Sequence, residues 1–166
     1  MSNQDRRGKS ISIRLAEDGF DVCINDIAAN QAGIDEASLD LTPSQNMEVQ
    51  ADAGPIIQTV RETQALGRES YGHAADVSKL AEVEGLIEAS VKNLGPLNVM
   101  IANAGIAQVK ALLDLSEDDV RRMFEVNVFG VFNCYSAAAK QMIKQGGGGK
   151  IVGCARFVFP FLLWIL

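Results

Sequence analysis

The sequence has little of several residue types on which whole classes of function depend. Its 166 residues contain three cysteines and one histidine, too few for a zinc-ligand set or a disulfide framework. We therefore expect no metal and a reducing compartment. Lysine and arginine number 15 against 21 aspartates and glutamates, which gives a net charge of −6. Nucleic-acid-binding proteins normally present a basic face, so we expect no nucleic-acid partner.

The remaining composition is that of a folded domain. Hydrophobic residues make up 48% of the chain, which excludes a disordered polyelectrolyte and can supply the core of one domain. The first residues, Met1–Arg7, are polar and charged and contain no apolar run typical of a secretory signal. The expected location is therefore cytoplasmic.

Helical and strand-like patterns alternate along most of the chain, which predicts an α/β fold with a doubly wound parallel sheet. The expected helices run from Gly8 to Asp18, from Pro55 to Gly67, from Ser78 to Leu94 and from Ser116 to Lys144, and the expected strands are Phe20–Asp26, Glu69–Ala75, Leu97–Ala102 and Lys150–Val152. Ser78 is the expected cap of its helix, and Ser116 with Asp119 is expected to open the last one. The hydrophobic residues between Ile27 and Met47 follow neither a helical nor a strand period, so we expect a flexible insertion near residues 28–50.

The carboxyl ends of the predicted strands carry the candidate binding residues, because ligands of parallel α/β sheets bind there. Asp26 lies 18 residues after Gly8, close to the separation between a phosphate-binding turn and an acidic residue that binds an adenosine ribose. A carboxylate there repels a 2′-phosphate and favours NAD over NADP. Asp76 and Asn103 end two further strands. The alternative is ordinary turn chemistry, since acidic residues, Asn and Gly are common where strands end.

Four of these segments together resemble the short-chain dehydrogenase/reductase family. They are the helix Gly8–Gly19, the pair Asp76-Val77, the run Ala102-Asn103-Ala104-Gly105 and the run Asn127-Val128-Phe129-Gly130. In that family the first segment corresponds to the helix after the glycine-rich turn, and the second to the pair that lies against the adenine. The third corresponds to the NNAG element, with its first Asn replaced by Ala102, and the fourth to the N-x-x-G element of a long helix.

The resemblance implies a Rossmann-type fold and hydride transfer between a nicotinamide cofactor and a small-molecule alcohol or ketone. It is nearest to diacetyl/acetoin reductases and to 3-oxoacyl reductases. Asn127 is then the family's catalytic Asn. The implied cofactor-binding residues are Gly8, Asp26, Asp76, Val77, Asn103, Ala104 and Gly105, with NAD expected rather than NADP. Residues 1–152 would form a partial dinucleotide-binding domain.

Two parts of the family pattern are missing from this sequence. No strand or TGxxxGxG turn precedes Gly8, where Arg6 and Arg7 either offer charge to a phosphate or form a solvated turn. A serine-bearing strand and a Tyr-x-x-x-Lys motif are also absent, and Arg156 stands at the serine position. The expected fold is therefore incomplete, lacking the first strand and the C-terminal third.

The missing proton-transfer residues change the expected function. Tyr135 and Lys140 are five residues apart and would point about 140° apart on a helix, so they do not replace the motif. We expect a short-chain dehydrogenase by descent with little or no activity. The alternative is a non-catalytic fragment that associates with a full-length homologue through the helix at residues 117–144.

Three remaining features have simple interpretations. His73 lies in a predicted strand, and no charged side chain is identified that would activate Cys154, so we expect a structural imidazole and an inert thiol. Residues 153–166 do not resemble the family, and the last ten, Phe157–Leu166, are uncharged. This apolar tail is shorter than a transmembrane helix. It is typical of a truncated or read-through product, with a membrane anchor as the alternative, and we expect no membrane partner.

Overall fold

The computed structural model describes residues 3–27, 55–108 and 110–154. The predicted insertion near residues 28–50 and the tail from Ala155 onward, Arg156 included, lie outside the described residues.

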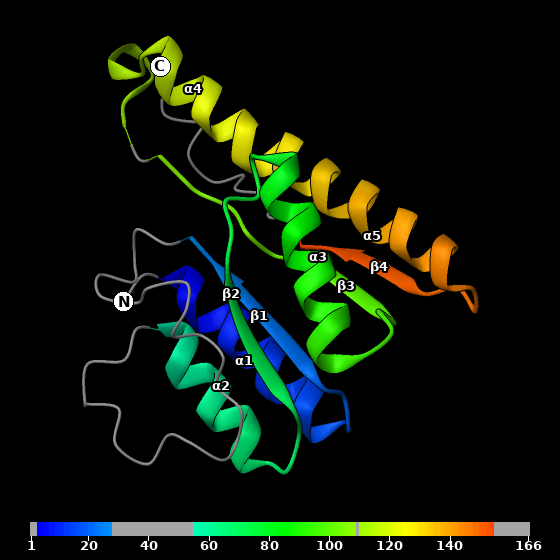
Figure 1. The fold of residues 1–166 in the computed structure, drawn as a ribbon. Coiled ribbons are helices and arrows are strands. Elements are labelled where there is room, and N and C mark those ends of the chain that lie inside the picture. Colours follow the sequence, from blue (N-terminus) through cyan, green and yellow to red (C-terminus); the bar gives the residue numbers. More distant parts are fainter. Residues whose placement is uncertain (1–2, 28–54, 109, 155–166) are drawn as a thin grey trace.

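Four short strands form two parallel pairs (Figure 1). Strand β1 (Val22–Asp26) pairs with β2 (Ser70–Ala74), and β3 (Val99–Ala102) pairs with β4 (Lys150–Gly153). Each pair is joined by a crossover that contains a helix, as parallel strands require. The predicted α/β class with parallel strands is confirmed, although among the described residues the strands form two sheets of two rather than one continuous sheet.

Helices lie on both sides of the strands. They are α1 (Asn3–Glu17), α2 (Pro55–Ala65), α3 (Leu80–Leu94), α4 (Glu117–Phe124) and α5 (Val131–Gln145), with a short 3₁₀ turn η3 (Leu112–Asp114) and a π-helical segment η4 (Glu125–Gly130). Helices α1 and α2 contact each other and β1, whereas α3 contacts α5. Figure 1 shows α3 in front of the strands and α1 behind them, so the strands form the middle layer.

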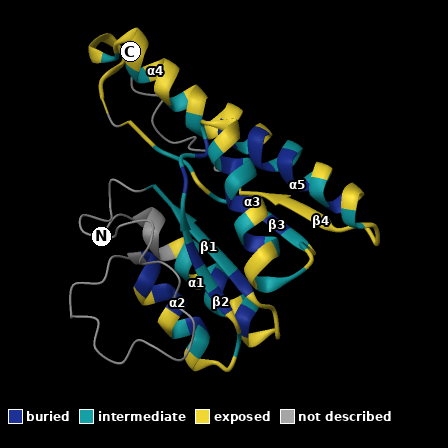
Figure 2. Ribbon diagram, in the orientation of Figure 1, coloured by how far each residue is buried: buried dark blue, intermediate teal, exposed yellow. Residues whose placement is uncertain are grey.

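The main core lies between α3, α5 and strand β3. Val83 and Ala138 are fully buried there, at the contact between the two helices. Met100 and Ala102 contribute the buried face of β3. Figure 2 shows buried residues along α3 and α5, whereas α4 is mostly exposed. Burial therefore fixes α5 against β3 and leaves α4 on the surface.

Two helix starts differ from the prediction. Helix α1 begins at Asn3 rather than Gly8, so Gly8 lies in its second turn. Helix α3 has Lys79 as its N-cap, with no side-chain capping bond, instead of Ser78. The reason is that Ser78 donates both its hydroxyl and its backbone N–H to Asp76, which holds it in the turn before the helix.

The predicted long helix is present in three parts. Ser116 and Asp119 form a complete capping box at the start of α4, as predicted. The π-helical segment η4 then interrupts the α-helical hydrogen bonding before α5 begins. A π-helical segment inside a helix is rare and occurs often at functional sites.

No helix among the described residues is long and apolar enough to cross a membrane.

Candidate functional site

A cavity of about 630 Å³ lies between β1 and β3. It runs along α1 from Gly8 to Leu15 and reaches the carboxyl ends of the strands. All seven residues predicted to bind the cofactor line it, namely Gly8, Asp26, Asp76, Val77, Asn103, Ala104 and Gly105. Asn127 does not line it. The structure therefore brings together residues that are as far apart in the sequence as Gly8 and Gly105.

Two polar side chains at the end of β1 face this region. Asp26 ends the strand, and its Oδ1 accepts a hydrogen bond of 2.8 Å from the backbone N–H of Ile27. Asn25 donates from Nδ2 to the carbonyl of Ala75 at 3.3 Å. Its Oδ1 is buried and has no hydrogen-bond donor among the described residues, and a buried acceptor of this kind is usually satisfied by a ligand or water.

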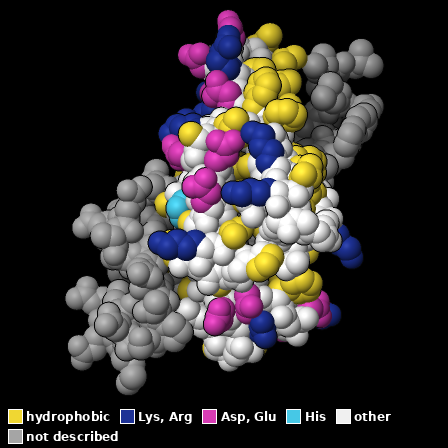
Figure 3. All heavy atoms as spheres, turned by 45° about the vertical axis from the view of Figure 1, so that its right-hand side comes forward, with side chains coloured by type: hydrophobic (Ala, Val, Ile, Leu, Met, Phe, Trp, Pro, Cys, Tyr) yellow, Lys and Arg dark blue, Asp and Glu magenta, His cyan; other side chains and the backbone are white. Residues whose placement is uncertain are grey.

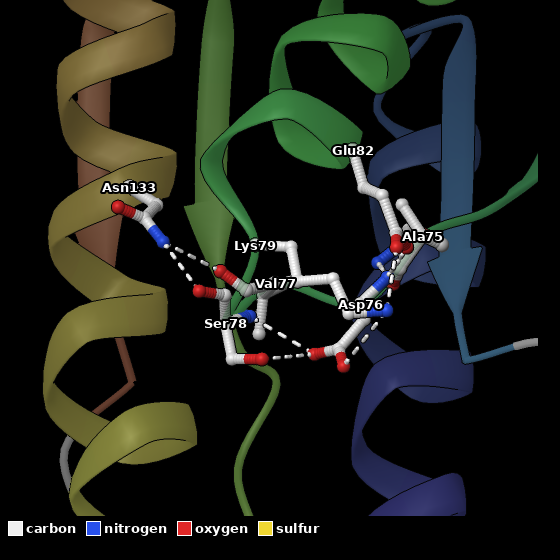
Figure 4. Close-up of polar contacts among 8 residues, drawn as sticks. Ala75, Asp76, Val77, Ser78, Lys79, Glu82 and Asn133 are labelled. Carbon is white, nitrogen blue, oxygen red and sulfur yellow. Dashed lines mark hydrogen bonds and ion pairs between the residues drawn. The ribbon is translucent and has the colours of Figure 1, made fainter.

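Asp76 organises the turn after β2 (Figure 4). Its Oδ1 accepts hydrogen bonds from Ser78 Oγ at 2.7 Å and from Ser78 N at 3.0 Å, and its own N–H donates to Glu82. Burial opposes ionisation of Asp76, but the Ser78 bonds and the nearby positive charges of Lys79 and Arg122 hold its pKa below the usual value. Asp76 is therefore an ionised acceptor at neutral pH.

Helix α5 and segment η4 fix the next residue, Val77. Asn133 is buried and donates from Nδ2 to the carbonyls of Val77 at 2.9 Å and Ser78 at 3.2 Å. Figure 4 shows it reaching across from its helix to this turn. A Cβ at Gly130 would come within 2.7 Å of Val77 Cγ2, so the glycine allows the helix to approach closely.

The loop after β3 contacts helix α1. A Cβ at Gly8 would lie 3.3 Å from Asn103 Nδ2, which is tighter than ordinary van der Waals contact. Gly8 thus leaves room for the Asn103 amide, which follows the buried Ala102 at the end of β3.

Asn127 of segment η4 is hydrogen-bonded to the same loop. Its Oδ1 accepts from Ile106 N at 2.8 Å, and its Nδ2 donates to Ile106 O at 2.9 Å. Both polar ends of the side chain are therefore used on the backbone of one residue. Asn127 itself is exposed, whereas Ile106 lines the cavity. Asn127 acts here as a positioning residue for the loop.

The residues that the sequence analysis did not expect to take part in catalysis lie outside the cavity. His73 is in β2, outside the lining of the cavity, and its ring lies 6.3 Å from that of Tyr71. Lys140 pairs with Glu84 at 3.2 Å, whereas Tyr135 packs against the core, so these two do not form a pair. Cys154 is exposed.

No group of three or more His, Cys, Asp or Glu side chains in the described part of the chain is placed to hold a metal ion.

Asn133 is a residue of this region that the sequence analysis missed. It is a buried polar residue on a helix whose other buried positions are mostly apolar. An amide among the apolar positions of the predicted helix is the signal that could have identified it, because buried amides require hydrogen-bond partners.

The fold is the Rossmann type found in short-chain dehydrogenases. The family model described as short chain dehydrogenase matches residues 33–155. The chain belongs to this family.

Known relatives agree with this assignment. The chain is 38% identical to a short-chain dehydrogenase/reductase of Armillaria gallica over 146 residues, which is 88% of this chain and 48% of the relative. It is 34% identical to a diacetyl reductase [(S)-acetoin forming] of Staphylococcus epidermidis over 145 residues, 87% of this chain and 47% of the relative. The chain thus spans about half the length of the curated relatives it matches.

A solved structure shows the same fold. The NAD-bound short chain dehydrogenase of Mycobacterium paratuberculosis superimposes with a TM-score of 0.68 at 26% identity, over 90% of this chain and 50% of that one. The described fold is therefore incomplete relative to its structural neighbours.

Proposed function

We propose that this chain binds NAD through the cavity between β1 and β3 and carries out little or no hydride transfer by itself. The relatives point to alcohol and ketone substrates of the diacetyl and acetoin type. The observation that supports cofactor binding is that seven residues, chosen from strand ends and motifs alone, line one cavity.

The residues fit the adenosine half of the cofactor. Asp26 places a carboxylate where β1 ends, and carboxylates accept hydrogen bonds from ribose hydroxyls. Asp76 and Val77 are held in a fixed turn by Ser78 and Asn133. Asn25 adds a buried acceptor without a donor among the described residues, which a bound group could satisfy.

The fit is poorer at the pyrophosphate. Binding there needs free backbone N–H groups at a helix N-terminus. Gly8 lies in the second turn of α1, where backbone N–H groups bond within the helix. In this chain Gly8 therefore supplies space beside Asn103 rather than a phosphate-binding amide.

The reaction of the family determines what this chain can and cannot do. A nicotinamide, when bound, supplies or accepts a hydride. Asn127 holds the loop at Ile106 through two hydrogen bonds, but an amide moves no proton at neutral pH. The sequence contains no Tyr-x-x-x-Lys motif to exchange a proton with the substrate oxygen. We therefore expect the chain alone to bind NAD but to catalyse little or no hydride transfer.

Titration with NADH tests this proposal. Nicotinamide fluorescence should rise as the chain is added, and Asp26→Asn should weaken binding severalfold, whereas Asp18→Asn, which changes an aspartate paired with Arg14 at the far end of α1, should not. Asp26→Arg should improve NADPH binding relative to NADH, because the carboxylate that repels a 2′-phosphate is gone. Equal binding by the Asp26 and Asp18 variants would contradict the proposal.

A second candidate function is association with a full-length homologue through α4, η4 and α5. Five apolar side chains between Val120 and Phe132 are 39–67% exposed, namely Val120, Phe124, Val128, Phe129 and Phe132. In Figure 3 hydrophobic side chains gather among charged ones in the upper part of the molecule, at the height of α4 in Figure 1. Contiguous exposed apolar residues of this kind favour a protein interface.

Co-purification separates the two functions. A tagged homologue should retain the chain, and Phe124→Asp with Phe132→Asp should abolish retention. Leu113→Asp changes an equally apolar side chain that is 97% exposed on η3, and it should leave retention unchanged. Retention together with absent NADH binding would favour the interaction function over cofactor binding.

A further inference from the structure

The described part of the cavity lining contains one unpaired basic side chain. Lys9 and Arg122 are the basic residues of this lining. Lys9 forms a salt bridge with Glu62 of α2. Arg122 of α4 forms no hydrogen bond or salt bridge with any described residue. Its guanidinium therefore keeps its N–H donors available to an anion in the cavity.

Helix α4 directs Arg122 toward the cavity. Arg122, Glu125 and Val126 lie at positions i, i+3 and i+4, which share one side of a helix, and all three line the cavity. The preceding residue, Arg121, is not among the lining residues and pairs with Glu117 at 2.6 Å. The two arginines are neighbours in the sequence, but only the second faces the candidate site.

Arg122 is close to both halves of the candidate site. Burial opposes ionisation of Asp76, whereas the Ser78 bonds, Lys79 and Arg122 lower its pKa, so Arg122 lies within electrostatic reach of that carboxyl. Arg122 is also five residues before Asn127, which holds the loop after β3. Under the proposed function, Asp76 belongs to the adenosine half of the site and this loop to the reactive half. In a dinucleotide, a diphosphate joins the two halves.

The acidic side chains near Arg122 do not neutralise it by direct contact. Asp76 Oδ1 accepts two hydrogen bonds from Ser78 (Figure 4), and its Oδ2 lies 3.9 Å from Lys79 Nζ. Glu125 also lines the cavity and forms no salt bridge with a described residue. Its carboxylate opposes anion binding, so we expect Arg122 to contribute a moderate rather than a large affinity.

The diphosphate of a dinucleotide needs positively polarised partners, and the start of α1 is poorly suited to supply them. Free backbone N–H groups at a helix N-terminus are the usual partners, but Gly8 lies in the second turn of α1. Its N–H group therefore bonds within the helix. Arginine is the side chain best suited to the task, because its planar fork of donors matches two phosphate oxygens.

We propose that Arg122 binds the diphosphate group of the dinucleotide from α4, an inference that rests on the proposed function because it requires a dinucleotide in the cavity. Arg122 then supplies the positive charge that free amides at the start of a helix supply in other dinucleotide sites. Since the side chain is exposed, the interaction is a charge-assisted hydrogen bond at the mouth of the cavity rather than a buried ion pair.

A comparison of ADP with adenosine isolates the diphosphate. By titration calorimetry, the wild type should bind ADP about tenfold more tightly than adenosine. Arg122→Gln should bring the affinity for ADP close to that for adenosine and leave the affinity for adenosine unchanged. An equal loss for both ligands would indicate that Arg122 only supports the structure, and it would overturn the proposal.

Arg121→Gln is the matched control. It removes the same charge from the neighbouring residue, which is not among the lining residues of the cavity, so the ratio of ADP to adenosine affinity should stay at the wild-type value. A similar loss in both variants would reveal a general effect of net charge and contradict the proposal. Arg122→Lys keeps the charge without the paired donors and should recover part of the affinity for ADP.

Ionic strength gives a second measure that a purely structural role would not change. The affinity of the wild type for NADH should fall more steeply with added sodium chloride than that of Arg122→Gln, because salt screens an exposed charge pair. Glutamine is a good helix former, so the far-ultraviolet circular dichroism of the variant should match the wild type. Parallel salt dependences in two folded proteins would count against Arg122 as the phosphate partner.

Inorganic pyrophosphate separates the failure of this inference from the failure of the proposed function. If the wild type and Arg122→Gln bind NADH equally well, the proposed function stands and the role of Arg122 is overturned. If the wild type does not bind NADH, the proposed function fails. A rise in unfolding midpoint with pyrophosphate, seen in the wild type and Arg121→Gln but not in Arg122→Gln, would then still support a diphosphate site at Arg122. The absence of that difference would overturn it.

Discussion

Asn127 and Ile106 are joined by a pair of reciprocal hydrogen bonds, with Asn127 Oδ1 accepting from Ile106 N at 2.8 Å and Asn127 Nδ2 donating to Ile106 O at 2.9 Å. The pair links segment η4 to the loop that follows β3. It satisfies two backbone groups that no strand or helix of the described chain uses at that point. The position of the loop from Asn103 to Ile106 therefore depends on a side chain 21 residues after Ile106.

Replacing Asn127 with Ala tests that dependence. Both backbone groups of Ile106 would then bond to water, since the site is exposed, and we expect a loss of about 1–2 kcal/mol in unfolding free energy. The urea midpoint should fall, and NADH binding should weaken because the loop is released. Asn93→Ala removes an exposed amide that bonds only within α3 and serves as the control. Equal midpoints for the two variants would show that the pair does not hold the loop.

Gly130 should be intolerant of alanine. A Cβ there would stand 2.7 Å from Val77 Cγ2, so the helix or the turn must shift, at a cost of about 1–3 kcal/mol. Gly85 in α3 is the matched control, since nothing lies within 4 Å of the Cβ it would gain. Gly85→Ala should stabilise the chain by about 0.5–1 kcal/mol. Thermal unfolding should move in opposite directions for the two variants, and a parallel shift would contradict the close contact.

The capping box of α4 should make stability depend on acid pH. Hydrogen bonds from Lys110 and from the N–H and hydroxyl of Ser116 lower the pKa of Asp119 to about 2. Because this pKa is below the ordinary value of 3.8, the carboxylate stabilises the fold above about pH 4, and the contribution is lost as the pH falls toward 2. The gap in urea midpoint between the wild type and Asp119→Asn should therefore narrow from pH 5 to pH 2.5.

Asn93→Ala provides the control for that titration. The exposed amide of Asn93 bonds to Ala89 O within α3 and does not ionise, so this substitution should give a gap that does not change with pH. A gap for Asp119 that stays constant over this range would show that Lys110 and Ser116 do not hold the carboxylate.

The three cysteines should react at very different rates. Burial raises the pKa of Cys23 to about 11, although a hydrogen bond from Ser90 opposes this, and burial also raises the pKa of Cys134 to about 11. Thiolates are the reactive form, so iodoacetamide at neutral pH should modify only the exposed Cys154. Mass spectrometry should find one adduct per native chain, three in urea, and none in native Cys154→Ser. Rapid addition of a second label to the native chain would contradict the raised pKa values of the half-buried Cys23 and the buried Cys134.

The sequence was most informative where structure depends on neighbouring residues. The capping box of Ser116 and Asp119 spans four residues and was predicted correctly. The alternation of strands and helices rests on local periods and gave the right class. The start of α3 was wrong because Ser78 had a competing partner, Asp76, two residues earlier. Such a competition is local too, but propensity alone does not decide it.

Other features depend on residues that are far apart in the sequence, and local patterns could not predict them. The contact between Gly130 and Val77 joins positions 53 apart, and the bond from Asn133 to Val77 joins positions 56 apart. The interruption of the long helix by η4 also has no local cause in composition. The candidate site stays a prediction from strand ends and motifs, and the hydrogen bonds around its residues were not predicted.

The π-helical segment η4 has a consequence for which changes this helix tolerates. Each residue of an α-helix turns the chain by about 100°, so deleting one residue from Glu125–Gly130 would rotate the whole of α5 relative to α4. Asn133 would leave Val77, and the buried face of α5 would turn away from β3. Substitutions between Glu125 and Gly130 should therefore be tolerated far better than a change in the number of residues, so the length of η4 constrains this part of the chain more than most of its side chains do.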